Sequence, residues 1–151
     1  MPFELDVYQT PKGEVPASSK AQGKVYTPPQ VGIATFLGGP IAGSLLLASN
    51  YATLGRRSAR TQALVWGVVG TAAALAVALV LPKNIPHSSL PVTYTAALYH
   101  FAKTSQVGDY QTRLATAGRQ SHWKAVGIGV ASLITLFALF TLYFMLVGND
   151  S

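Results

Sequence analysis

The sequence predicts an all-α, polytopic membrane protein with three transmembrane helices and one shorter helix. Three long segments, at about residues 31–49, 62–81 and 125–147, contain no Asp, Glu, Lys or Arg. About 20 apolar residues in a helix cross the roughly 30 Å hydrocarbon layer of a bilayer. Of the 151 residues 50% are hydrophobic and 11% are charged, whereas about a quarter of the residues in soluble domains are charged. Both observations place the helices in lipid.

The chain divides into a polar flexible N-terminal arm, residues 1–30, and a helical membrane domain, residues 31–151. The arm is rich in Pro, Ser, Gly and Lys, which interrupt any regular period. It has no apolar signal-peptide core, so we expect the first apolar segment to act as the insertion signal.

Composition and motifs argue against several chemistries. The net charge is +6, but the basic residues are spread over the loops, so we expect no nucleic-acid partner. There is no cysteine, and His87, His100 and His122 lack the close spacing of a zinc site. Neither a nucleophile elbow nor a phosphate-binding loop occurs, and no carboxylate lies in an apolar segment. We therefore expect no enzymatic activity, no metal and no cofactor.

The first apolar segment carries Gly38, Gly39 and Pro40 near its middle. Proline removes one backbone donor and crowds the carbonyl four residues before it. In lipid the freed groups must be satisfied by neighbouring helices or trapped water. Gly39 and Gly43 also form a small-xxx-small pair that lets another helix approach closely, although glycines are simply common in membrane helices. These four residues are the expected helix-break and packing positions of this segment.

Small-residue stripes also mark the two later segments. Gly70, Ala74 and Ala78 recur at four-residue spacing, with Ala63 and Gly67 nearby, and we expect this face to pack on the first segment. Gly127 and Ala131 form a similar stripe in the first half of the last segment, which predicts a second packing face there.

Two groups of residues suit a membrane interface. Arg56, Arg57 and Arg60 are the charges of the loop at residues 50–61. They are interpreted as a topology signal and interface anchor, with contact to anionic lipid or a partner as the alternative. Trp123 and Lys124 place an amphipathic ring beside a snorkelling amine just before the last segment.

Residues 88–103 predict a short helix that is interfacial or partly inserted and packs back on the second segment. Four apolar side chains recur there on one helical face: Leu90, Tyr94, Leu98 and Phe101. The apolar run is short and contains His100, yet a fourth span remains the alternative. A further helix of about two turns is expected at residues 109–117.

Span number and orientation are linked. With three spans and the N-terminus inside, eight of the 11 basic residues face inward and only the arginine loop faces outward. That arrangement puts Ser58 and Ser151 on the same side. With four spans the arginine loop and residues 104–122 face inward and both termini face outward.

Several short motifs resemble those of a widespread family of small bacterial inner-membrane proteins. They are YTPPQ at 26–30, ATFLGGPIAG at 34–43, NY at 50–51 with LG at 54–55, LP at 81–82 with IP at 85–86, and SHW at 121–123. The resemblance covers most of the chain after the arm. It implies a bacterial inner-membrane location and a helical fold, and it carries over no catalytic residues.

Two functional hypotheses follow. The first is a non-enzymatic interaction protein of the inner membrane, whose partner is another membrane protein or a second copy. One form of it is an immunity protein that neutralises a membrane-targeting toxin within the bilayer. The second is an oligomeric transport or channel component, in which the break at Gly38–Pro40 exposes backbone carbonyls to a solute.

Overall fold

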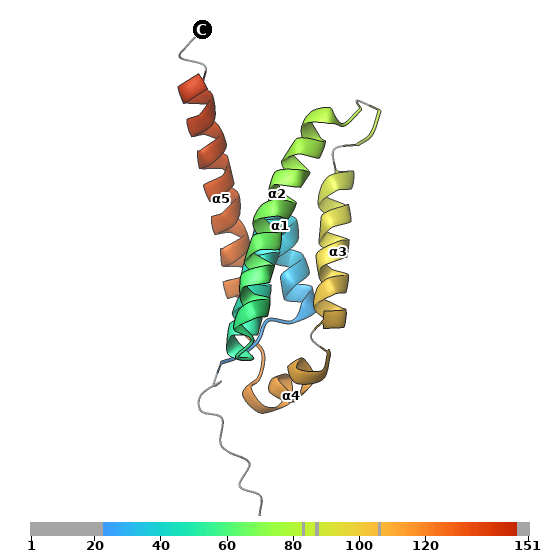
Figure 1. Cartoon of the computed structure of the whole chain (residues 1–151), viewed down its shortest axis with the longest axis vertical. Helices are drawn as coiled ribbons and strands as arrows, with labels where there is room; N and C mark the ends of the chain where they lie inside the picture. Colours follow the sequence, from blue (N-terminus) through green and yellow to red (C-terminus); the bar gives the residue numbers. More distant parts are fainter. Residues whose placement is uncertain (1–22, 83, 87, 106, 148–151) are drawn as a thin grey trace, which may run out of the picture.

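The computed structural model describes residues 23–82, 84–86, 88–105 and 107–147. Over these residues it confirms the all-α prediction, with five helices (Figure 1). They are α1 (Pro28–Thr53), α2 (Arg57–Val80), α3 (Ser89–Ser105), α4 (Val107–Ala117) and α5 (His122–Val147). Three of them, α1, α2 and α5, are long and apolar enough to cross a membrane by length and composition. The predicted flexible arm falls mostly on residues 1–22, outside the described part.

Helix α1 begins earlier than the apolar pattern indicated because the preceding residues cap it. The Gln30 amide N–H donates to the Thr27 side-chain oxygen at 3.4 Å, and the Thr27 amide N–H donates to Gln30 Oε1 at 2.8 Å. This reciprocal capping box satisfies backbone donors that the helix start would otherwise leave open. Pro28 then occupies the first helical position, where its missing N–H costs nothing.

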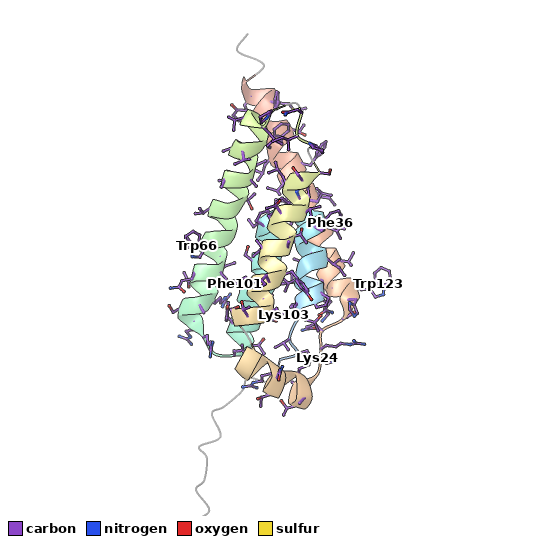
Figure 2. All side chains as sticks on the ribbon, turned by 90° about the vertical axis from the view of Figure 1, so that its right-hand side faces the viewer. Lys24, Phe36, Trp66, Phe101, Lys103 and Trp123 are labelled. Carbon is purple, nitrogen blue, oxygen red and sulfur yellow. The ribbon has the colours of Figure 1, made fainter. Side chains whose placement is uncertain are left out.

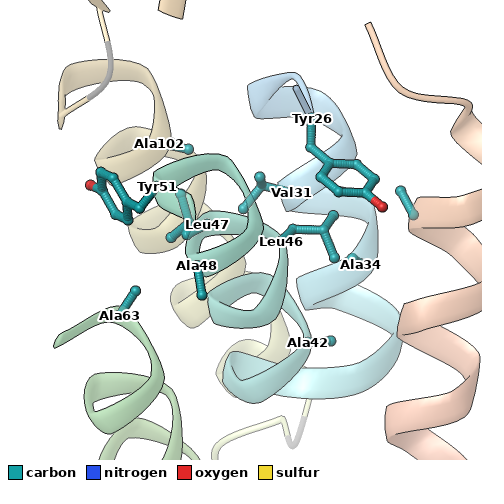
Figure 3. Packing of buried hydrophobic residues seen from close by; sticks show 11 residues of the cluster. Tyr26, Val31, Ala34, Ala42, Leu46, Leu47, Ala48, Tyr51, Ala63 and Ala102 are labelled. Carbon is teal, nitrogen blue, oxygen red and sulfur yellow. The ribbon is translucent and has the colours of Figure 1, made fainter. Parts of the chain in front are cut away.

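Helix α1 is a re-entrant hairpin, whereas the sequence predicted a crossing at residues 31–49 with a break near its middle. Gly39 has a φ of 73° and a ψ of −174°, and the chain reverses there into a second half of the helix. Residues 28–38 and 40–53 then lie side by side (Figure 3). A straight helix would hold Tyr26 and Asn50 about 36 Å apart, yet the two residues are hydrogen-bonded to each other.

The hairpin reaches only part of the way across a bilayer. Its first half, residues 28–38, rises about 16 Å and its second half, residues 40–53, about 21 Å. Both values are well below the roughly 30 Å of the hydrocarbon layer. The segment thus has the composition of a span, but it enters and leaves at the same end of the molecule.

The two halves of the hairpin hold most of the buried core. Val31 and Ala34 from the first half and Leu46 from the second are fully buried, and Leu47 is 1% exposed (Figure 3). The largest apolar side chains of α2 and α5 are instead exposed. A protein with its apolar core on one hairpin and apolar surfaces outside it is arranged for lipid around it.

The base of the hairpin is attached to the segment that precedes α5. The Gln120 amide N–H donates to the Val25 carbonyl at 2.9 Å, and the Val25 amide N–H donates to the Gly118 carbonyl at 3.4 Å. Gln30 Nε2 also donates to the Gln120 carbonyl at 2.7 Å. Residues 23–30, which the sequence placed in the flexible arm, are therefore ordered. Burial raises the pKa of the Tyr26 hydroxyl above its ordinary value.

The hairpin is also the centre of the helical arrangement. Among the described residues, α1 packs extensively on α2, α3 and α5, while these three have at most marginal contacts with one another. Helix α2 leads away from the hairpin base, and α3 returns alongside the hairpin. Helix α4 then lies across the base, and α5 leads away from the base again (Figure 1). The short helix expected at 88–103 is present as α3, but it packs on α1 rather than on the second apolar segment.

This course brings the described basic residues to one end of the molecule, which we call the basic end. Lys24 precedes the hairpin, Lys103 lies in the last turn of α3, and the arginine loop starts α2 (Figure 2). The remaining three, Arg113, Arg119 and Lys124, lie from α4 to the first turn of α5. Ser58 lies at this end, and the far end of α5 lies opposite. The sidedness expected for three straight spans, with the arginine loop opposite the other basic residues, is therefore corrected.

Candidate functional site

A cavity of about 580 Å³ lies between α2 and α3, and we call it the α2–α3 groove. Its floor is the second half of the hairpin, which contributes Ser44, Leu47 and Tyr51. It exists because α2 and α3 each pack on the hairpin but barely on each other. The hairpin therefore acts as a spacer that separates the two helices.

The walls of the groove come from two faces that the sequence separates widely. On α2, Ala59, Gln62 and Trp66 line it, and on α3, Leu98 and Phe101 line it. Figure 2 shows Trp66 on α2 and Phe101 on α3. The α3 residues belong to the apolar face recognised from their spacing, so that face is a groove wall.

A second cavity, of about 250 Å³, lies at the tip of the hairpin. Gly39, Ala74, Tyr94 and Leu136 contribute to its lining, so α1, α2, α3 and α5 all border it. Pro40 lines both cavities, and they adjoin at that residue. The half-depth hairpin leaves this space because no central helix continues beyond its tip.

The glycines of the first segment make the close contacts of the hairpin. A Cβ added to Gly38 would clash with the Gly129 carbonyl oxygen and lie 2.9 Å from the Ser132 Cβ of α5. A Cβ added to Gly43 would clash with the Thr35 hydroxyl in the other half of the hairpin, and would lie 3.2 Å from Leu98 of α3. Side chains at these positions are excluded by neighbouring backbone and helices.

On α2, the residue in closest contact with the hairpin is Gly67, which the sequence placed near the predicted stripe. A Cβ there would clash with the Ser44 hydroxyl and lie 2.6 Å from the Ser44 Cβ. The stripe itself lies beside this contact. Gly70 would place a Cβ 3.5 Å from the Pro40 Cβ, an ordinary contact, and Ala74 borders the smaller cavity.

The stripe predicted on the last segment is corrected. Gly127 and Ala131 are exposed, and a Cβ at Gly127 would meet nothing within 4 Å. Helix α5 instead packs on α1 through Ala125, Gly129 and Ser132, which are buried. Four-residue spacing identifies a smooth helical face, but α5 has two such faces and the sequence does not show which one meets the hairpin.

The predicted interface residues lie at the basic end and are exposed. Arg57 and Arg60 lie in the first turns of α2, and Arg56 is its N-cap. Trp123, 80% exposed, and Lys124 lie in the first turn of α5, on another side of the hairpin. The arginines and the Trp123–Lys124 pair thus lie at the same end of the molecule but on different helices, and they do not form one site.

The chemistry of the site is that of apolar binding. Among the described residues there is no group of three or more His, Cys, Asp or Glu side chains that could hold a metal ion. The polar atoms facing the larger cavity come from few side chains, among them Ser44, Tyr51 and Gln62. The Ser44 hydroxyl is already used within α1, where it donates to the Pro40 carbonyl.

Comparisons with known proteins found no protein-family model, no curated protein and no solved structure that matches this chain. The resemblance to a bacterial inner-membrane family is therefore still an expectation from the motifs alone.

Proposed function

We propose that the chain is a non-enzymatic interaction protein of a bacterial inner membrane that holds an apolar molecule in the α2–α3 groove. The observation that carries the proposal is the separation of α2 and α3 by the re-entrant hairpin. This separation leaves an apolar cavity of ligand size at the depth of the apolar helices. Such a cavity is a binding site for molecules that partition into the bilayer.

The volume of the groove favours a small occupant. One turn of an α-helix, about 10 Å wide and 5.4 Å long, occupies roughly 420 Å³. The groove, at about 580 Å³, has little more volume than one such turn. A single apolar chain therefore matches this volume better than several turns of a partner helix.

Filling the groove with a bulky side chain tests the proposal. Ala97 and its neighbour Ala96 are both exposed on α3, but Ala97 lines the groove and Ala96 does not. We expect Ala97→Trp to abolish crosslinking of a photoreactive fatty acid to the groove peptides, and Ala96→Trp to leave it unchanged. Gln62→Trp on the facing wall provides a second filled variant. Equal crosslinking of all variants would rule the groove out.

In the immunity form of this proposal, the interaction protects the cell from a membrane-targeting toxin. Deletion of the gene should then sensitise cells to the product of a neighbouring toxin gene or to sister cells that deliver it. Indifference of the deletion strain to both would exclude immunity and leave the groove proposal in place.

An oligomeric transport or channel component is the second candidate, favoured by the break of α1 at Gly39. Broken helices at membrane depth line solute sites in transporters. Here the cavity at the break is lined mainly by apolar residues such as Leu75, Ala78 and Leu136, which suits an ion poorly. Solute flux into liposomes containing the purified protein, altered by Pro40→Ala, would favour this candidate. Absence of flux for ions and small solutes would remove it.

A further inference from the structure

Resting on the proposed function, we infer that the occupant of the α2–α3 groove is an anionic phospholipid. One acyl chain lies in the groove and the headgroup lies at the basic end. The inference joins two independent features, the apolar cavity and the charge distribution around its mouth.

The cavity itself suits an acyl chain. Its lining is mainly apolar and includes the exposed side chains of Trp66 and Phe101. Because these exposed residues belong to α2 and α3, a chain can enter the groove from outside the helices. Burial of each methylene contributes about 0.8 kcal/mol relative to water, but relative to lipid the gain comes mainly from contact with the groove walls.

The charges around the mouth select the headgroup. Ala59 and Gln62 line the groove in the first two turns of α2, and Arg57 and Arg60 belong to the same turns. On α3, Lys103 lies in the last turn, seven residues after Ala96 and on the side of the helix that does not line the groove. Long basic side chains place their charge in the headgroup layer while their stems cover apolar surface. A phosphate at this end therefore lies near the cations at the start of α2.

Hydroxyl groups complete this end of the groove. Tyr51 lines the floor, and its hydroxyl donates to Ser105 Oγ at 3.2 Å. Among the described residues, the Lys and Arg side chains all lie at the basic end, which the smaller cavity at the hairpin tip does not reach. Charge complementarity thus assigns the headgroup to the basic end and the acyl chain to the direction of the hairpin tip.

The test uses the purified full-length protein in mild detergent, with equal amounts of phosphatidylglycerol and phosphatidylcholine of identical acyl chains. Native mass spectrometry measures the lipid that each protein retains. We expect one retained lipid, predominantly phosphatidylglycerol. Arg57→Gln with Arg60→Gln should lower the preference for phosphatidylglycerol by up to about 25-fold, since each basic residue near an anionic surface contributes on the order of fivefold.

The matched control is Arg119→Gln with Lys124→Gln, which removes the same charge from the basic end beside α5, away from the groove. This pair should leave the preference unchanged. Equal loss in both double variants would overturn the inference, because the preference would then belong to the whole basic end. Circular dichroism of each variant verifies that the helices are intact.

The groove-filling variants separate this inference from the proposed function. Ala97→Trp and Gln62→Trp should lose the retained lipid while Ala96→Trp keeps it. If the wild type retains both lipids equally and the filled variants retain neither, the headgroup inference is wrong and the groove proposal stands. If the filled variants retain lipid like the wild type, both proposals are wrong.

Discussion

Tyr26 and Asn50 hold each other through two reciprocal hydrogen bonds. The Tyr26 amide N–H donates to Asn50 Oδ1 at 2.7 Å, and Asn50 Nδ2 donates to the Tyr26 carbonyl at 2.8 Å. Both residues are buried, and they lie 24 positions apart in the chain. The Asn50 side chain thus satisfies both the N–H and the carbonyl of the Tyr26 main chain. It thereby joins the residues just before the hairpin to the second half of the hairpin.

Removal of this side chain should destabilise the protein. Asn50→Ala leaves a buried N–H and a buried carbonyl of Tyr26 without these partners, and each unsatisfied group costs about 1–3 kcal/mol. We expect the free energy of unfolding in detergent to fall by about 2 kcal/mol or more. Ser49→Ala, at the exposed neighbouring side chain, is the control and should change it little. Equal stability of both variants would show that the hairpin does not depend on this pair.

Gly39 should not tolerate a side chain, for a reason of backbone conformation. Its φ of 73° and ψ of −174° lie in a region that is essentially restricted to glycine, and holding a residue with a Cβ there costs about 1–3 kcal/mol. The nearest atom to an added Cβ is Leu136 Cδ1 at 3.9 Å, so crowding adds nothing. Gly39→Ala should therefore lower the free energy of unfolding by that amount.

Gly127→Ala is the matched control for this substitution. Gly127 is a helical position with open space around it, where alanine is favoured over glycine by up to about 1 kcal/mol. We expect equal or higher stability for this variant. A loss at Gly127 as large as the loss at Gly39 would contradict the assignment of strain to the hairpin tip.

Two glycines one turn apart on α2 should respond differently to the same substitution. Gly67→Ala places a methyl group against Ser44 of the hairpin, with its Cβ 2.6 Å from the Ser44 Cβ, and forces α2 away from α1. Gly70→Ala makes an ordinary 3.5 Å contact with Pro40. We expect a lower unfolding temperature for Gly67→Ala and no loss for Gly70→Ala. The reverse order would contradict the position of α2 on the hairpin.

The re-entrant hairpin makes a direct prediction about topology. Ser58 lies at the basic end, and Asn84 lies between α2 and α3 at the other end, and both are exposed. Because basic ends are retained in the cytoplasm, a membrane-impermeant maleimide should label Asn84→Cys in intact cells. It should label Ser58→Cys only after lysis, and the chain has no native cysteine to interfere. Labelling of Ser58→Cys alone in intact cells would favour a straight first span.

The sequence located the helices well because their signals are local. Long uncharged runs predicted α1, α2 and α5, and apolar spacing predicted α3 together with the face that lines the groove. The position of the break also followed from sequence, because a glycine pair before proline interrupts a helix wherever it occurs. What a local signal does not contain is the direction of the chain after the break.

That direction depends on contacts between distant residues. The reversal at Gly39 is held by Asn50 on Tyr26 and by Gln30 on the Gln120 carbonyl, which lies 90 positions away. Similarly, the choice between the two small faces of α5 depends on where Gly38 approaches Gly129. Spacing along one helix is equally compatible with either face.

By itself, the sequence determined that this is an all-helical membrane protein with apolar segments of spanning length and a weak point in the first of them. Only the tertiary structure decided that the first segment turns back, that the described basic residues share one end, and that α2 and α3 are held apart to leave a groove. The physical reason is that hydrophobicity and helix propensity act over neighbouring residues. A re-entrant hairpin is selected by hydrogen bonds and close packing between residues far apart in the chain.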